Sequence, residues 1–237
     1  MRELLRAGAD VRRVLVAEGR SEGEVVDELV ASARAAGIEV VTVPREELDR
    51  LLPGLVHQGV VAEAPAFPTV TLDAMLARAE AAGEAPLVVA LDGVTDPHNL
   101  GSIARSAEAV GAHGLVLPGR RSATVTPTVE KAAAGALAHL PVAVVPNLVR
   151  ALGELKERGL WVLGLDVAGE PLATHPLAAE AVVLVVGAEG AGLARLTRER
   201  CDALVGLPMR GRVGSLNASV AAGVSLFLLR GARDATG

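Results

Sequence analysis

Aromatic residues are nearly absent from this chain of 237 residues, which contains two Phe, one Trp and no Tyr. Proteins that bind single-stranded nucleic acid by stacking on its bases need aromatic side chains for that purpose. The composition therefore argues against stacking as the main mode of binding. Valine, leucine and alanine must fill the interior instead, and with 51% hydrophobic residues the chain has enough of them for a sizeable core.

Cysteine occurs once, as Cys201, which excludes an intrachain disulfide. A single thiol suits the reducing cytoplasm, and we expect Cys201 to be a small core residue. The first residues show no secretory signal pattern. The longest apolar stretch, residues 220–229, is shorter than the roughly 20 residues that span a bilayer. We therefore predict a cytoplasmic protein that does not contact a membrane.

An excess of positive charge is also lacking, because the formal net charge is −5. Proteins that bind nucleic acid over a broad surface carry a basic footprint. Any contact with RNA must then be a local patch, although each arginine taken alone could equally be a solvated surface residue. The candidate arginines are Arg2, Arg6, Arg12, Arg13 and Arg20 near the start, Arg120 and Arg121 in the middle, and Arg210 and Arg212 near the end.

Histidine or cysteine spacing typical of a metal site is missing as well. Asp92, Asp96 and His98 lie close together in the sequence and could be considered as ligands. Nothing else in the sequence completes such a set, so we expect no metal.

The first 64 residues alternate between short apolar runs and amphipathic segments, a pattern typical of a small α/β domain. Pro65 and Pro68 then interrupt the pattern, because proline cannot donate a backbone hydrogen bond to a sheet. We predict a small domain at residues 1–64, followed by a linker with a connecting helix at 65–82. The expected strands are 14–16, 38–43 and 59–62, and the expected helices are 22–36, 45–52 and 72–82.

Residues 83–237 contain further apolar runs, most of them separated by helical patterns. Such alternation is typical of an α/β domain whose parallel sheet is covered on both faces. The last segment, 215–230, is apolar on nearly every side and should be a buried helix, within the domain or against a second subunit. The expected strands are 87–90, 114–117, 142–145, 161–165, 182–186 and 203–207.

Three polar clusters follow predicted strands of this sheet. The first extends from Asp92 to Asn99 and on to Arg105, the second occupies 187–192, and the third occupies 207–219. Ligands of parallel α/β sheets bind at the carboxyl ends of the strands. The three clusters could therefore converge on one ligand.

Structural explanations exist for the first two clusters. The glycine spacing at 187–192 is not the dinucleotide fingerprint and occurs late in the chain, which disfavours a Rossmann dehydrogenase. A plain turn remains possible there, although Glu189 within it favours a function. In the first cluster, Asp96 and Asn99 could cap a helix at 100–110 and leave Arg105 on the surface.

The third cluster could be an ordinary connection between a strand and a helix, since Ser215 is a good N-cap for the last helix. Asn217 would then lie just inside that helix. Asparagine is a poor helix residue unless its amide has a partner.

Taken in order, the clusters resemble the three motifs of the SpoU/TrmH ribose 2′-O-methyltransferases. Asn99 with Arg105 matches motif one, Gly187-Ala188-Glu189-Gly190 matches motif two, and Leu207-Pro208-Met209 with Ser215-Leu216-Asn217-Ala218-Ser219 matches motif three. The string at 91–101, with His57-Gln58-Gly59-Val60-Val61, resembles the branch that methylates a guanosine in the peptidyl-transferase loop of 23S ribosomal RNA. The resemblance covers nearly the whole chain.

This resemblance implies a fold in which the C-terminal segment is threaded through a loop into a deep trefoil knot, an exception to the rule that chains are unknotted. It implies that the small domain is an RNA-binding module related to a ribosomal protein of the large subunit. It also implies a homodimer in which the last helix contributes to the interface and the active site draws on both subunits.

The same resemblance implies a binding site for S-adenosylmethionine formed by Gly187, Leu207 and Leu216, with Met209 and Ser219 as neighbours. The ribose 2′-oxygen would attack the methyl group of this cofactor.

Arg105 matches the family's catalytic arginine, but a guanidinium is a poor base at pH 7. We expect Arg105 to hold the adjacent phosphate and the 2′-oxygen, and Asn99 to fix Arg105. Glu189 would orient Arg105 or a neighbouring donor. Ser215 and Asn217 would bind the target nucleotide or shape the cofactor turn.

Other functions remain open at this point. The chain could methylate tRNA, or 23S RNA at an antibiotic-resistance site. It could instead be an RNA-binding protein that has lost catalysis, or a nucleotide-dependent oxidoreductase with an unusual loop.

Overall fold

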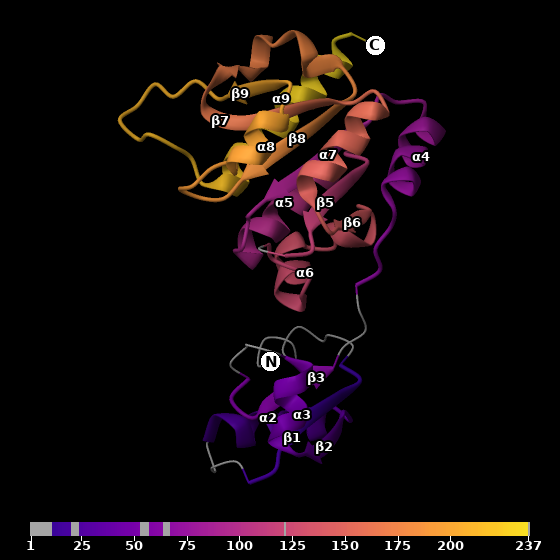
Figure 1. The fold of residues 1–237 in the computed structure, drawn as a ribbon, viewed down its shortest axis with the longest axis vertical. Helices are drawn as coiled ribbons and strands as arrows, with labels where there is room; N and C mark the ends of the chain where they lie inside the picture. The colour runs from indigo at the N-terminus through magenta and orange to yellow at the C-terminus, as the bar shows by residue number, and fades with distance from the viewer. Residues whose placement is uncertain (1–10, 20–23, 53–56, 64–66, 121, 237) are drawn as a thin grey trace. The chain divides into compact units, whose positions relative to one another are not determined.

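A computed structural model describes residues 11–19, 24–52, 57–63, 67–120 and 122–236. The chain divides into two compact units, Met1–Phe67 and Pro68–Gly237 (Figure 1). The division falls inside the predicted linker. Four of the candidate RNA-binding arginines, Arg2, Arg6, Arg20 and Arg121, lie outside the described residues, as does the start of the helix expected at 22–36.

The first unit is built on a three-stranded sheet with the order β2-β1-β3. The middle strand is parallel to β2 and antiparallel to β3. Alternate side chains of the middle strand pack on opposite faces, Val14 toward Ala33 of α2 and Leu15 toward Leu48 of α3. The elements are β1 (Arg13–Ala17), α2 (Glu24–Ala35), β2 (Glu39–Val43), α3 (Arg45–Leu51) and β3 (Val60–Glu63). They match the expected elements except at their ends.

Arg13, a candidate RNA contact, has a protein partner. Its Nε lies 2.6 Å from Glu63 Oε2 and its second guanidinium nitrogen 3.1 Å from Oε1. The two residues face each other across β1 and β3. Because the carboxylate already accepts from two nitrogens of the guanidinium, Arg13 contributes little net positive charge to this surface.

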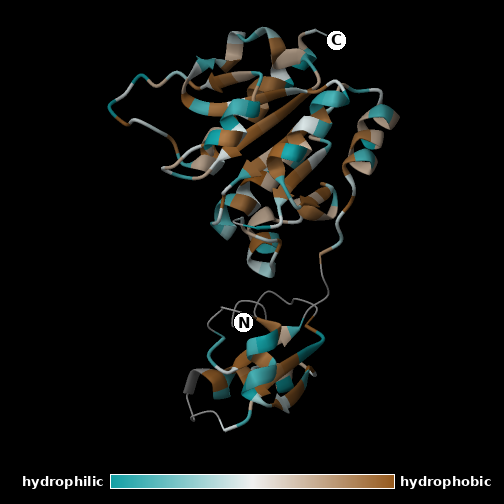
Figure 2. Cartoon of the chain, viewed as in Figure 1, coloured by the Kyte–Doolittle hydropathy of each residue, from teal (hydrophilic) through white to brown (hydrophobic). Residues whose placement is uncertain are grey.

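The second unit contains a six-stranded sheet with the order β6-β5-β4-β8-β7-β9, in which all neighbours are parallel. The two central strands are almost wholly buried, and Figure 2 shows the apolar colour concentrated along them. The strands are β4 (Leu87–Asp92), β5 (Gly114–Pro118), β6 (Val142–Val145), β7 (Trp161–Pro171), β8 (Val182–Gly187) and β9 (Ala203–Gly206). The predicted α/β class with a parallel sheet is confirmed.

Helices cover this sheet. They are α4 (Leu72–Ala82), α5 (Pro97–Ala109), α6 (Pro127–Ala133), α7 (Leu148–Glu157), α8 (Arg195–Arg200) and α9 (Ala218–Asp234). The expected connecting helix, α4, belongs to the core of this unit: Met75 is fully buried, and a Cβ on Gly114 would lie 2.3 Å from its sulfur. The helix of the predicted segment 65–82 thus lies in the second unit.

The last helix begins later than expected. It begins at Ala218 with Asn217 as its N-cap, so the N-cap predicted at Ser215 is wrong. Within a single chain the helix leaves Val220, Val224 and Phe227 50%, 44% and 60% exposed, so the domain alone does not bury it and the predicted alternative of a second subunit stays open. These residues recur at helical spacing and form an exposed apolar stripe along α9.

The last helix returns from the edge of the sheet toward its centre. β9 lies at the edge of the sheet, whereas α9 returns to contact α5, β8 and the 3-10 turns Leu172–Thr174 and Pro176–Ala179. The C-terminal segment thus comes back against the connection between β7 and β8.

Cys201 packs against the main core at its edge, and burial raises the pKa of its thiol to about 11. Among the described residues no helix is long and apolar enough to cross a membrane. In the same part of the chain, no three His, Cys, Asp or Glu side chains are grouped as metal ligands.

His113 makes the stability of the second unit dependent on pH. It is 7% exposed, its Nδ1 accepts a hydrogen bond from Leu87 N at 3.0 Å, and burial lowers its pKa. Below the ordinary value of 6.5 the unfolded chain takes up a proton that the folded protein resists. We expect the free energy of unfolding to fall as pH is lowered from 7 to 5, measured by urea denaturation.

The variant His113→Gln should lose this part of the pH dependence. His139→Gln, which changes an exposed histidine, is the matched control and should keep it. An equal slope in both variants would show that other groups cause the effect.

Candidate active site

The segment after β8 folds into a closed glycine loop. Ala188 N donates to Gly192 O at 3.0 Å, and Gly192 N donates to Ala188 O at 2.8 Å. Gly190 and Gly192 have φ of +77° and +68°, a region that favours glycine. A Cβ on Gly187 would lie 2.3 Å from the carbonyl carbon of Gly192. Gly187 is therefore required by the loop's own backbone, and not only by a ligand as the sequence suggested.

The far end of this loop is held by Asp92, the last residue of β4. Its Oδ2 accepts a hydrogen bond from Ala194 N at 2.7 Å. Asp92 lies opposite Gly187 in the register of β4 and β8. The sequence predicted Asp92 as part of the first polar cluster, but not its hydrogen bond to the amide of the neighbouring loop.

A three-residue amide and carboxylate network joins the three polar clusters. Asn99 Nδ2 donates to Glu189 Oε2 at 3.2 Å, and Asn217 Nδ2 donates to Asn99 Oδ1 at 3.0 Å and to Glu189 Oε2 at 3.4 Å. Asn99 is 5% exposed and lies within α5, whose N-cap is Asp96. The alternative in which Asn99 helps to cap this helix is thus wrong.

The start of α9 fixes the orientation of Asn217 in this network. Its Oδ1 accepts from Ser219 N at 2.9 Å, from Ser219 Oγ at 2.7 Å and from Val220 N at 3.4 Å. Only the oxygen of an amide can accept, so its nitrogen must face Asn99 and Glu189. The amide of Asn217 therefore has the hydrogen-bond partners that an asparagine at the start of a helix needs.

A cavity of about 410 Å³ lies at the carboxyl end of β8 and beside the middle of β7. Its walls are formed by residues 165–167, 186–192 and 215–216, with Ala218 and Ala221. Of the predicted site residues, Gly187, Glu189, Ser215 and Leu216 line it. Leu207, Met209 and Ser219 are not among the lining residues: the first two lie in the segment after β9, and the hydroxyl of Ser219 is bound at the N-cap of α9.

Asp166 is a charged residue of this cavity that was not predicted from the sequence. Its Oδ1 accepts from Ala168 N at 2.9 Å and its Oδ2 pairs with Arg198. The hydrogen bond from Ala168 and the charge of Arg198 lower the pKa of Asp166, so it is ionised at neutral pH. The only sequence signal was an acidic residue directly after the apolar run of β7.

Arg105 is exposed on α5 and makes no hydrogen bond or ion pair with any described residue. It follows Asn99 by six residues, which places the two side chains about 120° apart around the helix. Asn99 therefore does not fix Arg105 as expected, because its amide is bound to Glu189 and Asn217.

Two family models match the chain. The model of RNA 2′-O ribose methyltransferase substrate binding matches residues 1–70, and that of the SpoU rRNA methylase family matches residues 86–227. The chain belongs to the SpoU family. It is an S-adenosylmethionine-dependent enzyme that methylates ribose 2′-hydroxyl groups of RNA.

Relatives of known sequence and structure agree with this assignment. A Bacillus subtilis protein assigned to the TrmH family of tRNA/rRNA methyltransferases, YacO, is 43% identical over 99% of this chain and 94% of its own. An uncharacterised tRNA/rRNA methyltransferase of Mycolicibacterium vanbaalenii is 46% identical over 94% of this chain and 71% of its own. The crystal structure of the SpoU methyltransferase AviRb from Streptomyces viridochromogenes with AdoMet has a TM-score of 0.64 and 31% identity, covering 99% of this chain and 87% of that one.

The cavity of this SpoU protein fits the cofactor of its family. A volume of about 410 Å³ is within the usual range of small-molecule pockets. Leu165, Val167 and Leu216 supply apolar walls, and the glycine loop supplies backbone polar groups. Asp166 also lines the cavity, but its carboxylate is paired with Arg198 and adds little net negative charge there.

Proposed function

We propose that this enzyme methylates the ribose of a guanosine in the peptidyl-transferase loop of 23S ribosomal RNA, as a cytoplasmic homodimer. The observation that carries the proposal is the network of Asn99, Glu189 and Asn217 beside the cavity, which unites the three motifs. The choice of RNA rests on the string at 91–101 and on His57-Gln58-Gly59-Val60-Val61. Residues 1–64 would bind the RNA substrate, which the family match at 1–70 supports.

We assign the predicted site residues separate roles in this mechanism. S-adenosylmethionine, when bound, supplies the methyl group. Leu216 and the glycine loop hold the cofactor, and Arg105 holds the phosphate and the 2′-oxygen of the target nucleotide in line with it. Asn99 and Glu189 position the start of α9 through Asn217, and Ser215 binds the nucleotide at the cavity wall. The family resemblance also assigns Leu207, Met209 and Ser219 to cofactor binding, although they do not line the cavity.

Methylation of defined transcripts tests this function. We expect tritium transfer from labelled S-adenosylmethionine to a 23S fragment that contains the peptidyl-transferase loop, and mapping should place one 2′-O-methyl group on a guanosine. Preferential labelling of tRNA, or of another 23S region, would replace the proposed substrate by one of its alternatives. Cofactor binding without transfer to any RNA would support a non-catalytic RNA-binding protein.

The exposed stripe of α9 supports the proposed homodimer. Val220, Val224 and Phe227 form a contiguous apolar face on a helix that begins at the active-site network. Apolar faces of this kind are commonly covered by a partner. A two-fold dimer through α9 would bring a second copy close to Asn217, so that the site draws on both subunits.

We expect Phe227→Asp to convert the dimer to a monomer and to lower methyl transfer at least ~10-fold, because burying an unpaired carboxylate in an interface is costly. Analytical ultracentrifugation measures the mass. Leu196→Asp, which changes an exposed apolar residue of α8, is the control and should remain dimeric. A dimer that persists in Phe227→Asp at micromolar concentration would contradict this interface.

A further inference from the structure

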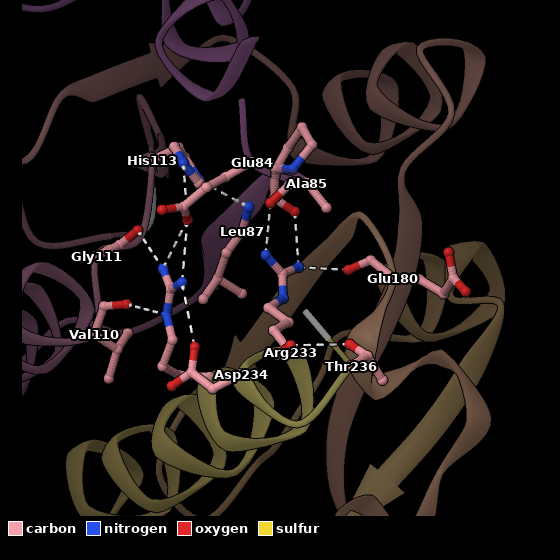
Figure 3. Close-up of polar contacts among 12 residues, drawn as sticks. Glu84, Ala85, Leu87, Val110, Gly111, His113, Glu180, Arg233, Asp234 and Thr236 are labelled. Carbon is pink, nitrogen blue, oxygen red and sulfur yellow. Dashed lines mark hydrogen bonds and ion pairs between the residues drawn. The ribbon is translucent and has the colours of Figure 1, made fainter. Parts of the chain in front are cut away.

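Two arginines in the last turns of α9, Arg230 and Arg233, bind backbone carbonyls (Figure 3). The Arg233 guanidinium donates to Ala85 O at 2.6 Å, to Pro86 O at 2.9 Å and to Glu180 O. Ala85 and Pro86 lead into β4, and Glu180 precedes β8. Arg233 therefore links the amino ends of β4 and β8. The carboxyl ends of the same two strands carry Asp92 and the glycine loop.

Arg230 binds a different element. Its Nε donates to Val110 O at 2.7 Å, and a terminal nitrogen donates to Gly111 O at 3.1 Å. These carbonyls end α5, where a helix leaves carbonyls unpaired and a cation is favourable. Both terminal nitrogens also lie 3.1 Å from Glu84 Oε2. Arg230 thus ties α9 to the C-terminal end of α5.

The two helices run side by side between these ties and the active site. At one end Asn217 of the α9 N-cap binds Asn99 in the first turn of α5. At the other end Arg230 binds Val110. Between them, a Cβ on Gly223 would lie 3.2 Å from Ser106 Oγ, so α9 approaches α5 closely. Asn217 and Arg230 are roughly 20 Å apart along the helix, at 1.5 Å per residue.

We propose that Arg230 and Arg233 are positioning residues for methyl transfer, which fix the axial position of α9 along α5 and so hold Asn217 against Asn99 and Glu189. The proposal rests on the proposed function of that network. A helix transmits an axial displacement over its whole length because its hydrogen-bonded backbone is stiff. The bonds of Asn217 at 3.0 and 3.4 Å leave little room for such a displacement.

The positive charge of Arg233 allows it to keep its hydrogen bonds to these carbonyls at neutral pH. Burial lowers its pKa to about 10, with the nearby charge of Arg230 acting in the same direction, so it remains charged at neutral pH. Its Nε is buried without a hydrogen-bond partner among the described residues. The carbonyls of Ala85, Pro86 and Glu180 are therefore the groups that hold the Arg233 guanidinium. A lysine ammonium cannot reproduce the planar arrangement of its donors.

Two variants test the proposal: Arg230→Gln and the milder Arg233→Lys. Arg150→Gln, which removes an exposed arginine paired with Glu154 on α7, is the control. Each is assayed at a temperature where circular dichroism shows it fully folded. We expect kcat for methyl transfer to fall at least tenfold in both variants, with KM for RNA within twofold of wild type. Amide exchange of Ser219, whose N–H binds Asn217, should accelerate at least tenfold.

Unchanged kcat and unchanged Ser219 exchange, with only a lower melting temperature, would overturn the proposal and leave the arginines a purely stabilising role. If Arg230→Gln does not fold, Arg233→Lys alone decides between these outcomes. Should the wild type methylate none of the RNAs tested, the proposed function fails, whereas the exchange rate of Ser219 still tests the tie.

Discussion

Replacing Arg105 by alanine is expected to reduce methyl transfer by a factor on the order of 100 or more, while the affinity for S-adenosylhomocysteine stays within a few-fold of wild type. The side chain is exposed and bound to no other described residue, so its removal leaves the fold and the cavity intact. Its proposed partners, a phosphate and the 2′-oxygen, are present only with RNA. Loss of orientation of a reacting group costs rates of this size.

Single-turnover transfer of labelled methyl and calorimetric binding of S-adenosylhomocysteine measure the two quantities separately. Arg195→Ala, which removes an exposed arginine that pairs with Glu199 on α8, is the matched control and should retain activity. Arg105→Lys should recover only part of the rate, because an ammonium lacks the planar fork that a guanidinium offers to a phosphate. A loss of cofactor affinity in Arg105→Ala would refute the role assigned to this residue.

The sheet could be predicted because its strands are continuous apolar runs that end at polar residues. The run that became β4 ends at Asp92 and the run that became β8 ends at Gly187, and the structure places these two residues opposite each other. The order of the strands could not be derived in the same way. Nothing in the local pattern of β9 indicates that it pairs with β7 at the edge of the sheet.

The site was predicted as a set of residues, but its contacts were not. The sequence required a partner for the amide of Asn217, and the structure provides Asn99 and Glu189, residues 118 and 28 positions away. The same logic failed for Ser215, because a serine and an asparagine both cap helices well and only the backbone path decides between them. Asp166 was missed because an isolated acidic residue after a strand resembles any other surface residue.

The last helix shows why burial is hard to infer from composition. An almost wholly apolar segment is expected to be buried, yet α9 exposes Val220, Val224 and Phe227 within a single chain. The sequence left open whether the domain or a second subunit covers this helix, because an apolar pattern does not say which molecule packs against it. The exposed apolar stripe of α9 therefore supports the proposed dimer. It does not indicate that the helix was wrongly predicted.

Gly187→Ala is expected to lower affinity for S-adenosylmethionine at least ~10-fold and to lower the free energy of unfolding by about 1–3 kcal/mol, the usual cost of overpacking. The added Cβ would lie 2.3 Å from Gly192 C and 2.5 Å from both Gly192 O and Leu193 N, all of them backbone atoms that no rotamer change can move. The loop must therefore open, and it forms one wall of the cavity. Calorimetry and urea denaturation measure the two effects.

Gly119→Ala is the control, because a Cβ there would meet only ordinary contacts, the nearest at 3.6 Å. A second variant separates the cavity from the fold: Leu216→Ala removes a cavity wall that is 38% exposed, so it should weaken cofactor binding with little loss of stability. Wild-type affinity in both Gly187→Ala and Leu216→Ala would place the cofactor outside this cavity. Weakened binding in Leu216→Ala at unchanged stability would show that the cavity itself, and not general loosening of the fold, receives the cofactor.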